Sequence, residues 1–383
     1  MNKKEYGLVL SGGGTRGAYQ VGVWKALKEL EIDIKAIVGT SIGALNGALF
    51  LQDDFSRTVK MYEQIKIDNI MKIEGVNSNK NIFDLSNIFN LAANLKKQKG
   101  IDNTPLREMI KQYIDMDKLY NSEIDFGLVT YSVKNKTPLQ KFKNEIPKEK
   151  MEDYLLASSC FPIFKPQTID AEEYFDGGLY DNAPSNMLIE KGYKNIIIAD
   201  IEGMGFGRKS INKNVYVKVI RPTEDLGGTF EFNHEKIINN IKMGYLDTMK
   251  SFNKLQGHKY YFQPEEFAKM LEKFNLQTIY GLEYAAEIYK MYKYREYTFE
   301  EFITELNERH TEAEKTFEKM KKENLIQIGK RLNKLFDKGL GICIAKDLYM
   351  DRPASRVSNY LFNFVKDYIV AAKALIELKN YMG

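Results

Sequence analysis

Two glycine-rich turns in the first fifty residues constrain this chain most, because each turn directly follows a short apolar run. The first is Ser-Gly-Gly-Gly-Thr-Arg-Gly at residues 11–17, after the apolar residues 7–10. The second is Gly-Thr-Ser-Ile-Gly at residues 39–43, after residues 36–38, and a helix-compatible segment follows it. Two strand-turn-helix units in succession predict an α/β fold with a mostly parallel central sheet.

The second turn has the G-x-S-x-G pattern of a nucleophile elbow. In such an elbow a serine hydroxyl stands at the start of a helix, on a sharp bend between a strand and that helix. Gly39 and Gly43 flank Ser41, and glycine alone adopts the dihedral angles of such a bend cheaply. Ser41 is therefore the candidate nucleophile of a serine hydrolase.

The first turn offers backbone donors to an anionic oxygen. Four of the six residues from 12 to 17 are glycine, namely Gly12, Gly13, Gly14 and Gly17, so several N–H groups can turn toward one point. An amphipathic helix follows, and the dipole at its N-terminus adds to the same site. Arg16 is expected to add a fixed positive charge that supports the transition state or an anionic part of the substrate. The turn therefore predicts an oxyanion hole.

A nucleotide-binding interpretation of the same turn is weaker. Gly12, Gly14 and Gly17 also match the dinucleotide fingerprint G-x-G-x-x-G. That fingerprint expects an acidic residue at the end of the second strand, whereas Val38 here runs straight into the elbow. The loop also lacks the Gly-Lys-Ser or Gly-Lys-Thr of a phosphate-binding loop. The hydrolase interpretation is therefore preferred.

A third motif, Asp-Gly-Gly at residues 176–178, supplies a candidate general base. Gly177 and Gly178 let the backbone approach another loop closely, which suits a carboxylate that must reach a serine hydroxyl. An isolated Asp-Gly-Gly is more often a surface turn. Together with the two N-terminal turns, the motif favours Asp176 as the base.

In this order the three motifs resemble those of the patatin-like phospholipases. Two further segments are similar to the pattern of that family: Asp-Asn-Thr-Pro-Leu at residues 102–106 and Ala-Ser-Ser-Cys-Phe-Pro-Ile-Phe-Lys-Pro at residues 157–166. The resemblance covers about residues 5–225. It implies a three-layer α/β/α fold and the hydrolysis of lipid acyl esters without a metal or other cofactor.

The resemblance also implies roles for individual residues. Ser41 and Asp176 would form a catalytic dyad that works without histidine, through an acyl-serine intermediate. Gly12, Gly13 and Gly14 would form the oxyanion hole.

The scarcity of histidine agrees with a dyad. The chain has three histidines, at positions 234, 258 and 310, and none lies in a motif. A triad in the order Ser, Asp, His would use His234. In α/β-hydrolases, however, the elbow normally follows several strands, whereas Ser41 follows the second. We therefore expect His234 to be an exposed residue in a loop or at the start of a helix.

The length of 383 residues and the 44% hydrophobic content predict more than one domain. Apolar runs predict strands at residues 6–11, 36–39, 126–133, 195–201 and 215–220. After residue 225 the composition shifts toward Lys, Glu, Tyr and Met, which predicts helices. We divide the chain into a catalytic domain over residues 1–258 and a helical domain over residues 259–383. Within the first, the polar segment 52–100 is either a lid over the acyl site or a pair of surface helices.

Charge and hydropathy restrict the partners. A net charge of +4, from 56 basic and 52 acidic residues, predicts no nucleic-acid binding. No apolar run approaches the ~18 residues of a membrane span, and the residues before the first strand are not expected to form a signal peptide. The two cysteines are expected to be small buried side chains. The chain is therefore expected in the cytoplasm, with peripheral membrane contact; its oligomeric state is left open.

A basic amphipathic helix is predicted over residues 321–338. Its apolar face is formed by Leu325, Ile328, Leu332 and Leu335, with lysines and one arginine around it. Such a helix either rests on anionic lipid head groups or packs on neighbouring helices.

Three functions remain open from the sequence. The leading one is a lipid acyl hydrolase of the phospholipase A or lysophospholipase type. A short-chain carboxylesterase or an acyltransferase would use the same motifs on a different acyl chain or acceptor. A partner-binding protein that acts through residues 259–383 is the alternative of another class, and the intact Ser41 and Asp176 argue against it.

Overall fold

The computed structural model describes residues 4–72, 100–208, 214–321, 341–343, 345–346 and 359–383. Its contacts divide the chain into two compact units, Met1–Thr248 and Met249–Gly383. The boundary predicted after residue 258 falls inside the second unit. Most of the predicted polar insertion, residues 73–99, and nearly all of the predicted basic helix lie outside the described residues.

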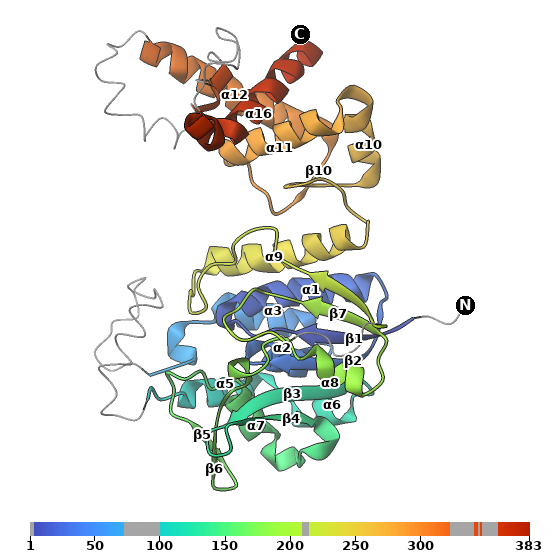
Figure 1. Ribbon diagram of the computed structural model, residues 1–383, viewed down its shortest axis with the longest axis vertical. Coiled ribbons are helices and arrows are strands. Elements are labelled where there is room, and N and C mark those ends of the chain that lie inside the picture. Colours follow the sequence, from blue (N-terminus) through green and yellow to red (C-terminus); the bar gives the residue numbers. More distant parts are fainter. Residues whose placement is uncertain (1–3, 73–99, 209–213, 322–340, 344, 347–358) are drawn as a thin grey trace. The chain divides into compact units, whose positions relative to one another are not determined.

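The first unit is built on a sheet in which eight strands are described (Figure 1). Their order is β5-β6-β3-β2-β1-β7-β8, and β4 also pairs with β3. Strands β1, β2, β3, β7 and β8 are parallel, whereas β4 and β6 are antiparallel to β3, and β5 is antiparallel to β6. The strands are β1 (Glu5–Leu10), β2 (Asp33–Thr40), β3 (Asp125–Ser132), β4 (Thr137–Phe142), β5 (Gln167–Ile169), β6 (Glu172–Asp176), β7 (Asn195–Ala199) and β8 (Tyr216–Ile220).

Helices cover both faces of this sheet. Because side chains alternate along a strand, Val9 and Val38 face the same side, where Leu188 of α8 packs against them. Ile37 and Phe126 face the other side, where Gly47 of α2 lies against both. The helices are α1 (Ala18–Glu29), α2 (Ile42–Phe50), α3 (Phe55–Gln64), α5 (Thr104–Tyr113), α6 (Met116–Asn121), α7 (Met151–Ser158), α8 (Ser185–Glu190) and α9 (His234–Ser251), the last of which crosses the division between the units. The predicted three-layer α/β/α fold is confirmed.

The sequence predicted the parallel strands but not the antiparallel ones. The five predicted strands correspond to β1, β2, β3, β7 and β8. Strand β4 was not predicted because most of its residues are half-buried and its sequence Thr-Pro-Leu-Gln-Lys-Phe has little apolar periodicity. Strands β5 and β6 are short, with three and five residues. This omission matters because β6 ends at Asp176.

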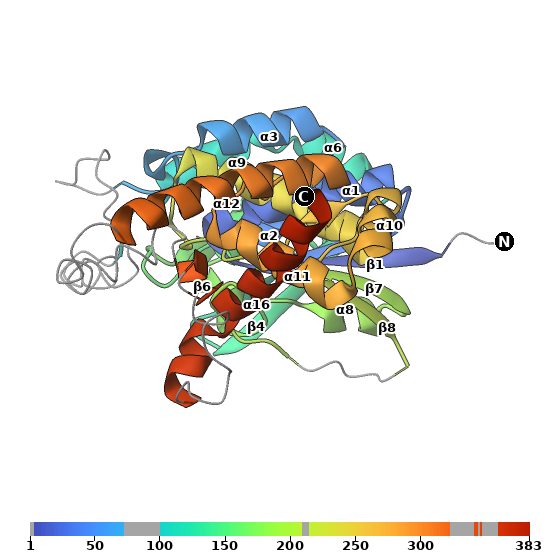
Figure 2. The same ribbon diagram turned by 90° about the horizontal axis from the view of Figure 1, so that it is seen from above.

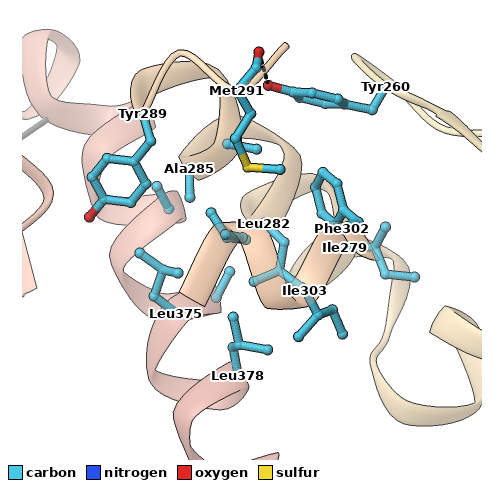
Figure 3. Close-up of a cluster of buried hydrophobic side chains, with 14 of the residues drawn as sticks. Tyr260, Ile279, Leu282, Ala285, Tyr289, Met291, Phe302, Ile303, Leu375 and Leu378 are labelled. Carbon is cyan, nitrogen blue, oxygen red and sulfur yellow. Dashed lines mark hydrogen bonds between the residues drawn. The ribbon is translucent and has the colours of Figure 1, made fainter. Parts of the chain in front are cut away.

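The second unit is mainly helical, as the sequence predicted. Helix α11 (Leu276–Ile288) packs along α16 (Asn359–Met382), as seen from above in Figure 2. Figure 3 shows its core, in which Leu282 and Ala285 of α11 lie near Leu375 and Leu378 of α16. The remaining described elements are α10 (Pro264–Lys273), α12 (Phe299–Lys321) and the short parallel pair β9 (Tyr261–Phe262) and β10 (Glu296–Tyr297).

No helix among the described residues is both long enough and apolar enough to cross a membrane.

Candidate active site

Ser41 occupies a strained turn between β2 and α2. Its backbone has φ 57° and ψ −127°, a conformation that a non-glycine residue keeps only when its surroundings enforce it. A β-carbon on Gly39 would lie 2.3 Å from the backbone of Gly43, and one on Gly43 would lie 2.1 Å from the carbonyl oxygen of Leu10. Both glycines are therefore required by close backbone packing around the serine.

Sheet register brings Asp176 next to this turn. Thr40, the last residue of β2, pairs with Val129 of β3, and the next residue of β3, Thr130, pairs with Asp176 of β6. A β-carbon on Gly177 would lie 2.3 Å from the carbonyl oxygen of Val129, so the Asp-Gly-Gly turn lies directly against β3. Residues far apart in the sequence thus meet across one strand.

Ser158, at the end of α7, ties the two strands together at this point. The Ser41 N–H donates to Ser158 Oγ at 3.1 Å, and Ser158 Oγ donates to the carbonyl oxygen of Val129 at 2.7 Å. In addition, the Thr40 hydroxyl donates to the carbonyl oxygen of Asp181 at 2.8 Å. The strained Ser41 backbone is therefore held from both sides.

The Asp176 carboxylate is buried, with 4% of the residue exposed. Burial raises its pKa to about 6, while hydrogen bonds from the Ser41 hydroxyl and the Gly178 N–H lower it. The Gly178 N–H donates to Asp176 Oδ1 at 2.7 Å. Burial outweighs the two hydrogen bonds, so the carboxylate is a stronger base than an exposed aspartate and is still ionised at neutral pH.

The three glycines of the first turn differ in what their backbone groups contact. The Gly12 N–H donates to the carbonyl oxygen of Asn182 at 3.1 Å, and the Gly12 carbonyl accepts from Asn182 Nδ2 at 3.2 Å. A trans peptide group directs its C=O and N–H in opposite directions, so the Gly13 N–H is turned away from Asn182. Within the described residues this N–H has no hydrogen-bond partner. Gly14, with φ 61°, begins the short 3₁₀ helix η1 (Gly14–Gly17) that leads into α1.

Arg16 and Gly17 have structural contacts of their own. Arg16 Nε donates to the carbonyl oxygen of Gly227 at 2.7 Å, and one of its terminal nitrogens donates to that of Glu202 at 2.6 Å. Arg16 is not among the residues that line the cavity described below. A β-carbon on Gly17 would lie 2.4 Å from the Ile42 side chain, so Gly17 lets η1 approach α2.

Ser41, Asp176, Gly13 and Gly14 all line one cavity of about 340 Å³. The remaining lining is mainly apolar, with side chains that include Ile42, Leu45, Leu106, Phe161, Phe164 and Phe230. A cavity of this size and lining suits a hydrocarbon chain, with the polar groups gathered at one place beside it.

Two residues of this arrangement were missed by sequence reasoning. Ser158 lies in the segment 157–166, and Asn182 follows the Asp-Gly-Gly turn in Asp-Asn-Ala-Pro, so both were next to recognised motifs. Their hydrogen bonds join segments more than 100 residues apart. No local sequence pattern reports such pairs.

The histidines lie elsewhere. His234 is the exposed first residue of α9, as predicted, and its Nδ1 is 3.0 Å from the carbonyl oxygen of Glu63. His258 and His310 belong to the second unit. Among the described residues, no group of three or more His, Cys, Asp or Glu side chains is arranged to hold a metal ion. Cys160 and Cys343 are buried free thiols, as predicted.

Comparison with known proteins identifies relatives that match parts of this chain. Over 63 residues, 16% of this chain, the sequence is 56% identical to lysophospholipase nte1 of Aspergillus terreus. Over 195 residues, 51% of this chain, it is 28% identical to patatin-like phospholipase domain-containing protein 7 of Mus musculus. The matched segments are 4% and 13% of those relatives, so this chain corresponds to a small part of each.

A solved structure and a family model also match. The crystal structure of VipD from Legionella pneumophila aligns with a TM-score of 0.42 and 15% identity, covering 99% of this chain and 86% of that one. The family model of patatin-like phospholipases matches residues 8–189, which include both turns, Ser41 and Asp176. Residues 8–189 of this chain therefore match the patatin-like phospholipase family, which the three motifs resemble.

Proposed function

We propose that this protein is a lipid acyl hydrolase, of the phospholipase A or lysophospholipase type, that uses Ser41 as nucleophile and Asp176 as general base. The observation that carries the proposal is the meeting of the Ser41 hydroxyl and the buried Asp176 carboxylate at the edge of an apolar cavity. The names of the relatives, a lysophospholipase and a patatin-like phospholipase domain protein, support the same substrate class.

The first half of the reaction forms an acyl-enzyme. Asp176 takes the hydroxyl proton as Ser41 Oγ attacks the ester carbonyl carbon. When the tetrahedral intermediate collapses, the bond to the alcohol oxygen breaks, and the proton passes from Asp176 to that oxygen. In the second half, water attacks the acyl-serine and gives a proton to Asp176. Ser41 then leaves with that proton, and the fatty acid is released.

We assign the oxyanion hole to the backbone N–H groups of Gly13 and Gly14. The Gly12 N–H is already donated to Asn182, so Gly12 contributes by being anchored, which directs the Gly13 N–H toward the cavity. The N-terminal end of η1 and α1 adds a favourable dipole at the same position. Arg16, which binds two loop carbonyls, is assigned to holding those loops rather than to contacting the substrate.

The cavity supports a long acyl chain as the substrate group. Its aliphatic and aromatic lining gives a hydrocarbon chain the contacts that a short acetyl or butyryl group would leave empty. A lipid ester therefore gains more binding free energy here than a short-chain ester does. This argument favours the phospholipase over the carboxylesterase alternative.

The test is fatty-acid release from phospholipids, lysophospholipids and short p-nitrophenyl esters by the wild type, Ser41→Ala and Asp176→Asn. The matched control is Asp170→Asn, because Asp170 is exposed in the β5–β6 turn and pairs with Lys150. We expect release from long-chain lipids that both active-site variants abolish and the control retains. Activity confined to short esters would support the carboxylesterase instead. Full activity in Asp176→Asn would contradict the dyad.

A further inference from the structure

Three apolar side chains are exposed at the mouth of the cavity. The exposed fractions are 37% for Leu179, 47% for Met204 and 68% for Phe206, and all three residues also line the cavity. Phe206 has the largest exposed fraction of any large apolar side chain in the described residues. We call these three residues the rim.

The rim is attached to the Asp-Gly-Gly turn by the backbone. The Asn182 N–H donates to the Phe206 carbonyl at 2.7 Å, and the Phe206 N–H donates to the Gly178 carbonyl at 3.1 Å. The loop that carries Met204 and Phe206 therefore has a defined position relative to Asp176. Its apolar side chains face solvent although that exposure is unfavourable.

The positively charged side chain of Arg208 lies close in sequence to the rim. Arg208 is exposed, two residues after Phe206, and its guanidinium carbon lies 4.2 Å from the centre of the Tyr180 ring. Exposed aromatic and aliphatic side chains next to an arginine match the chemistry of a lipid surface, where acyl chains lie below anionic phosphates.

We propose that the rim inserts into the surface of a lipid bilayer or micelle, so that the cavity opens directly against the acyl chains. This inference rests on the proposed function. An acyl chain that crossed water to reach Ser41 would expose every methylene group on the way, whereas entry from an inserted rim keeps the chain in an apolar environment. A protein seated on the rim would instead cover the entrance, which argues for a lipid surface as the occupant. All three rim residues belong to the first unit.

The test measures vesicle binding by the full chain with Ser41→Ala, so that no lipid is consumed. Vesicles of phosphatidylcholine, with and without an anionic lipid, are sedimented and the bound fraction of protein is determined. We expect the added changes Met204→Ser and Phe206→Ser each to lower the partition coefficient about tenfold. The control Tyr216→Ser, at a residue 51% exposed on β8 and outside the cavity lining, is expected to bind as the parent does.

A second readout reports insertion directly. Phe206→Trp is expected to shift its emission to shorter wavelength when vesicles are added, whereas Tyr216→Trp is expected to show no shift. Thermal unfolding of each variant checks that the fold is retained, and we expect no change because the side chains are exposed.

Failure of this inference differs from failure of the proposed function. If the Ser41→Ala protein does not bind vesicles, or if the Met204→Ser/Phe206→Ser double variant binds as well as its parent, the rim is not a membrane-docking surface, whatever lipid the wild type hydrolyses. Rim-dependent binding by a wild-type protein that releases no fatty acid would keep the docking surface and reject the hydrolase.

Discussion

Each unit of the chain buries a carboxylate, and the two carboxylates are held in different ways. Glu283 of α11 accepts hydrogen bonds from the backbone N–H groups of His258, Lys259 and Tyr260. Asp176 accepts one backbone N–H, from Gly178, and otherwise faces the Ser41 hydroxyl and the cavity. Burial raises the pKa of both groups.

The proposed general base therefore differs from Glu283 in more than its burial. The oxygens of Glu283 are occupied by the loop that they hold, so this side chain stabilises the second unit. Asp176 accepts a hydrogen bond from the Ser41 hydroxyl and lies beside a cavity of about 340 Å³. Substitutions that remove either carboxylate or its hydrogen-bond partners test this difference.

The largest expected effect is the difference in hydrolysis rate between variants of the two carboxylates. Asp176→Asn is expected to lower the rate of lipid hydrolysis at least ~100-fold, because the amide cannot accept the serine proton. Glu283→Gln is expected to leave the rate per folded molecule within about threefold, since the hydrogen bonds of Glu283 join α11 to residues 258–260 within the second unit. Initial rates with matched folded concentrations measure both. Equal losses in the two variants would mean that the two carboxylates do not differ in their effect on catalysis.

A smaller loss of activity is expected when the Gly13 N–H is no longer held in its orientation. Asn182→Ala removes the side-chain bond to the Gly12 carbonyl, and we expect kcat to fall about 10- to 100-fold with little change in KM. Asn195→Ala is the matched control, because Asn195 Nδ2 also donates to a backbone carbonyl, that of Glu5, at 3.2 Å. A rise in KM with unchanged kcat would mean that Asn182 only shapes the cavity.

The raised pKa of Asp176 predicts a pH dependence. The proposed base acts in its ionised form, and burial raises the pKa of Asp176 to about 6, so kcat/KM should be constant above that pH and fall about tenfold per unit below it. Rates from pH 4.5 to pH 8 on an uncharged ester measure the profile. A decline that begins only near pH 4 would indicate a carboxylate like that of an exposed aspartate.

As the pH rises and Asp176 ionises, activity should increase, whereas the contribution of Asp176 to the free energy of unfolding should decrease. Burial raises the pKa of Asp176 in the folded protein to about 6, above its ordinary value of 3.8, so this group favours folding fully below pH 3.8 and loses that contribution as the pH rises through 6. Asp176→Asn is therefore expected to raise the free energy of unfolding at pH 8 by up to about 3 kcal/mol, at about 1.4 kcal/mol per pKa unit.

Denaturant titrations at pH 8 and pH 3.5 measure this difference, which should shrink at the lower pH. Glu283→Gln is expected to destabilise the protein at pH 8, by about 1 to 3 kcal/mol, because one backbone N–H loses its acceptor. A destabilised Asp176→Asn protein at pH 8 would mean that the hydrogen bonds to Asp176 outweigh its burial.

The smallest effect is expected at His234. His234→Ala should change the hydrolysis rate less than about twofold, because the residue is exposed, contacts the Glu63 carbonyl and does not line the cavity. A loss comparable to that of Ser41→Ala would overturn the dyad in favour of a triad.

The sequence by itself determined the parts of the site that depend on local backbone geometry. The elbow and the glycine turn are readable because glycines must stand where neighbouring backbone leaves no space, as Gly39 and Gly43 do. The parallel strands were readable because they are buried apolar runs bounded by turns. The helical second unit was readable from composition and periodicity.

Only the tertiary structure decided how these parts meet. Asp176 reaches Ser41 through the register of β2, β3 and β6, and β6 is too short and too polar to be recognised in the sequence. Contacts between distant residues also decided the hydrogen bond from the Gly12 N–H to Asn182 and the hydrogen bond from the Ser41 N–H to Ser158. The exposure of Phe206 at the cavity mouth likewise depends on which segments pack around it. Local sequence specifies the conformation of a turn, whereas hydrogen-bond partners, burial and the resulting pKa depend on which segments pack together in space.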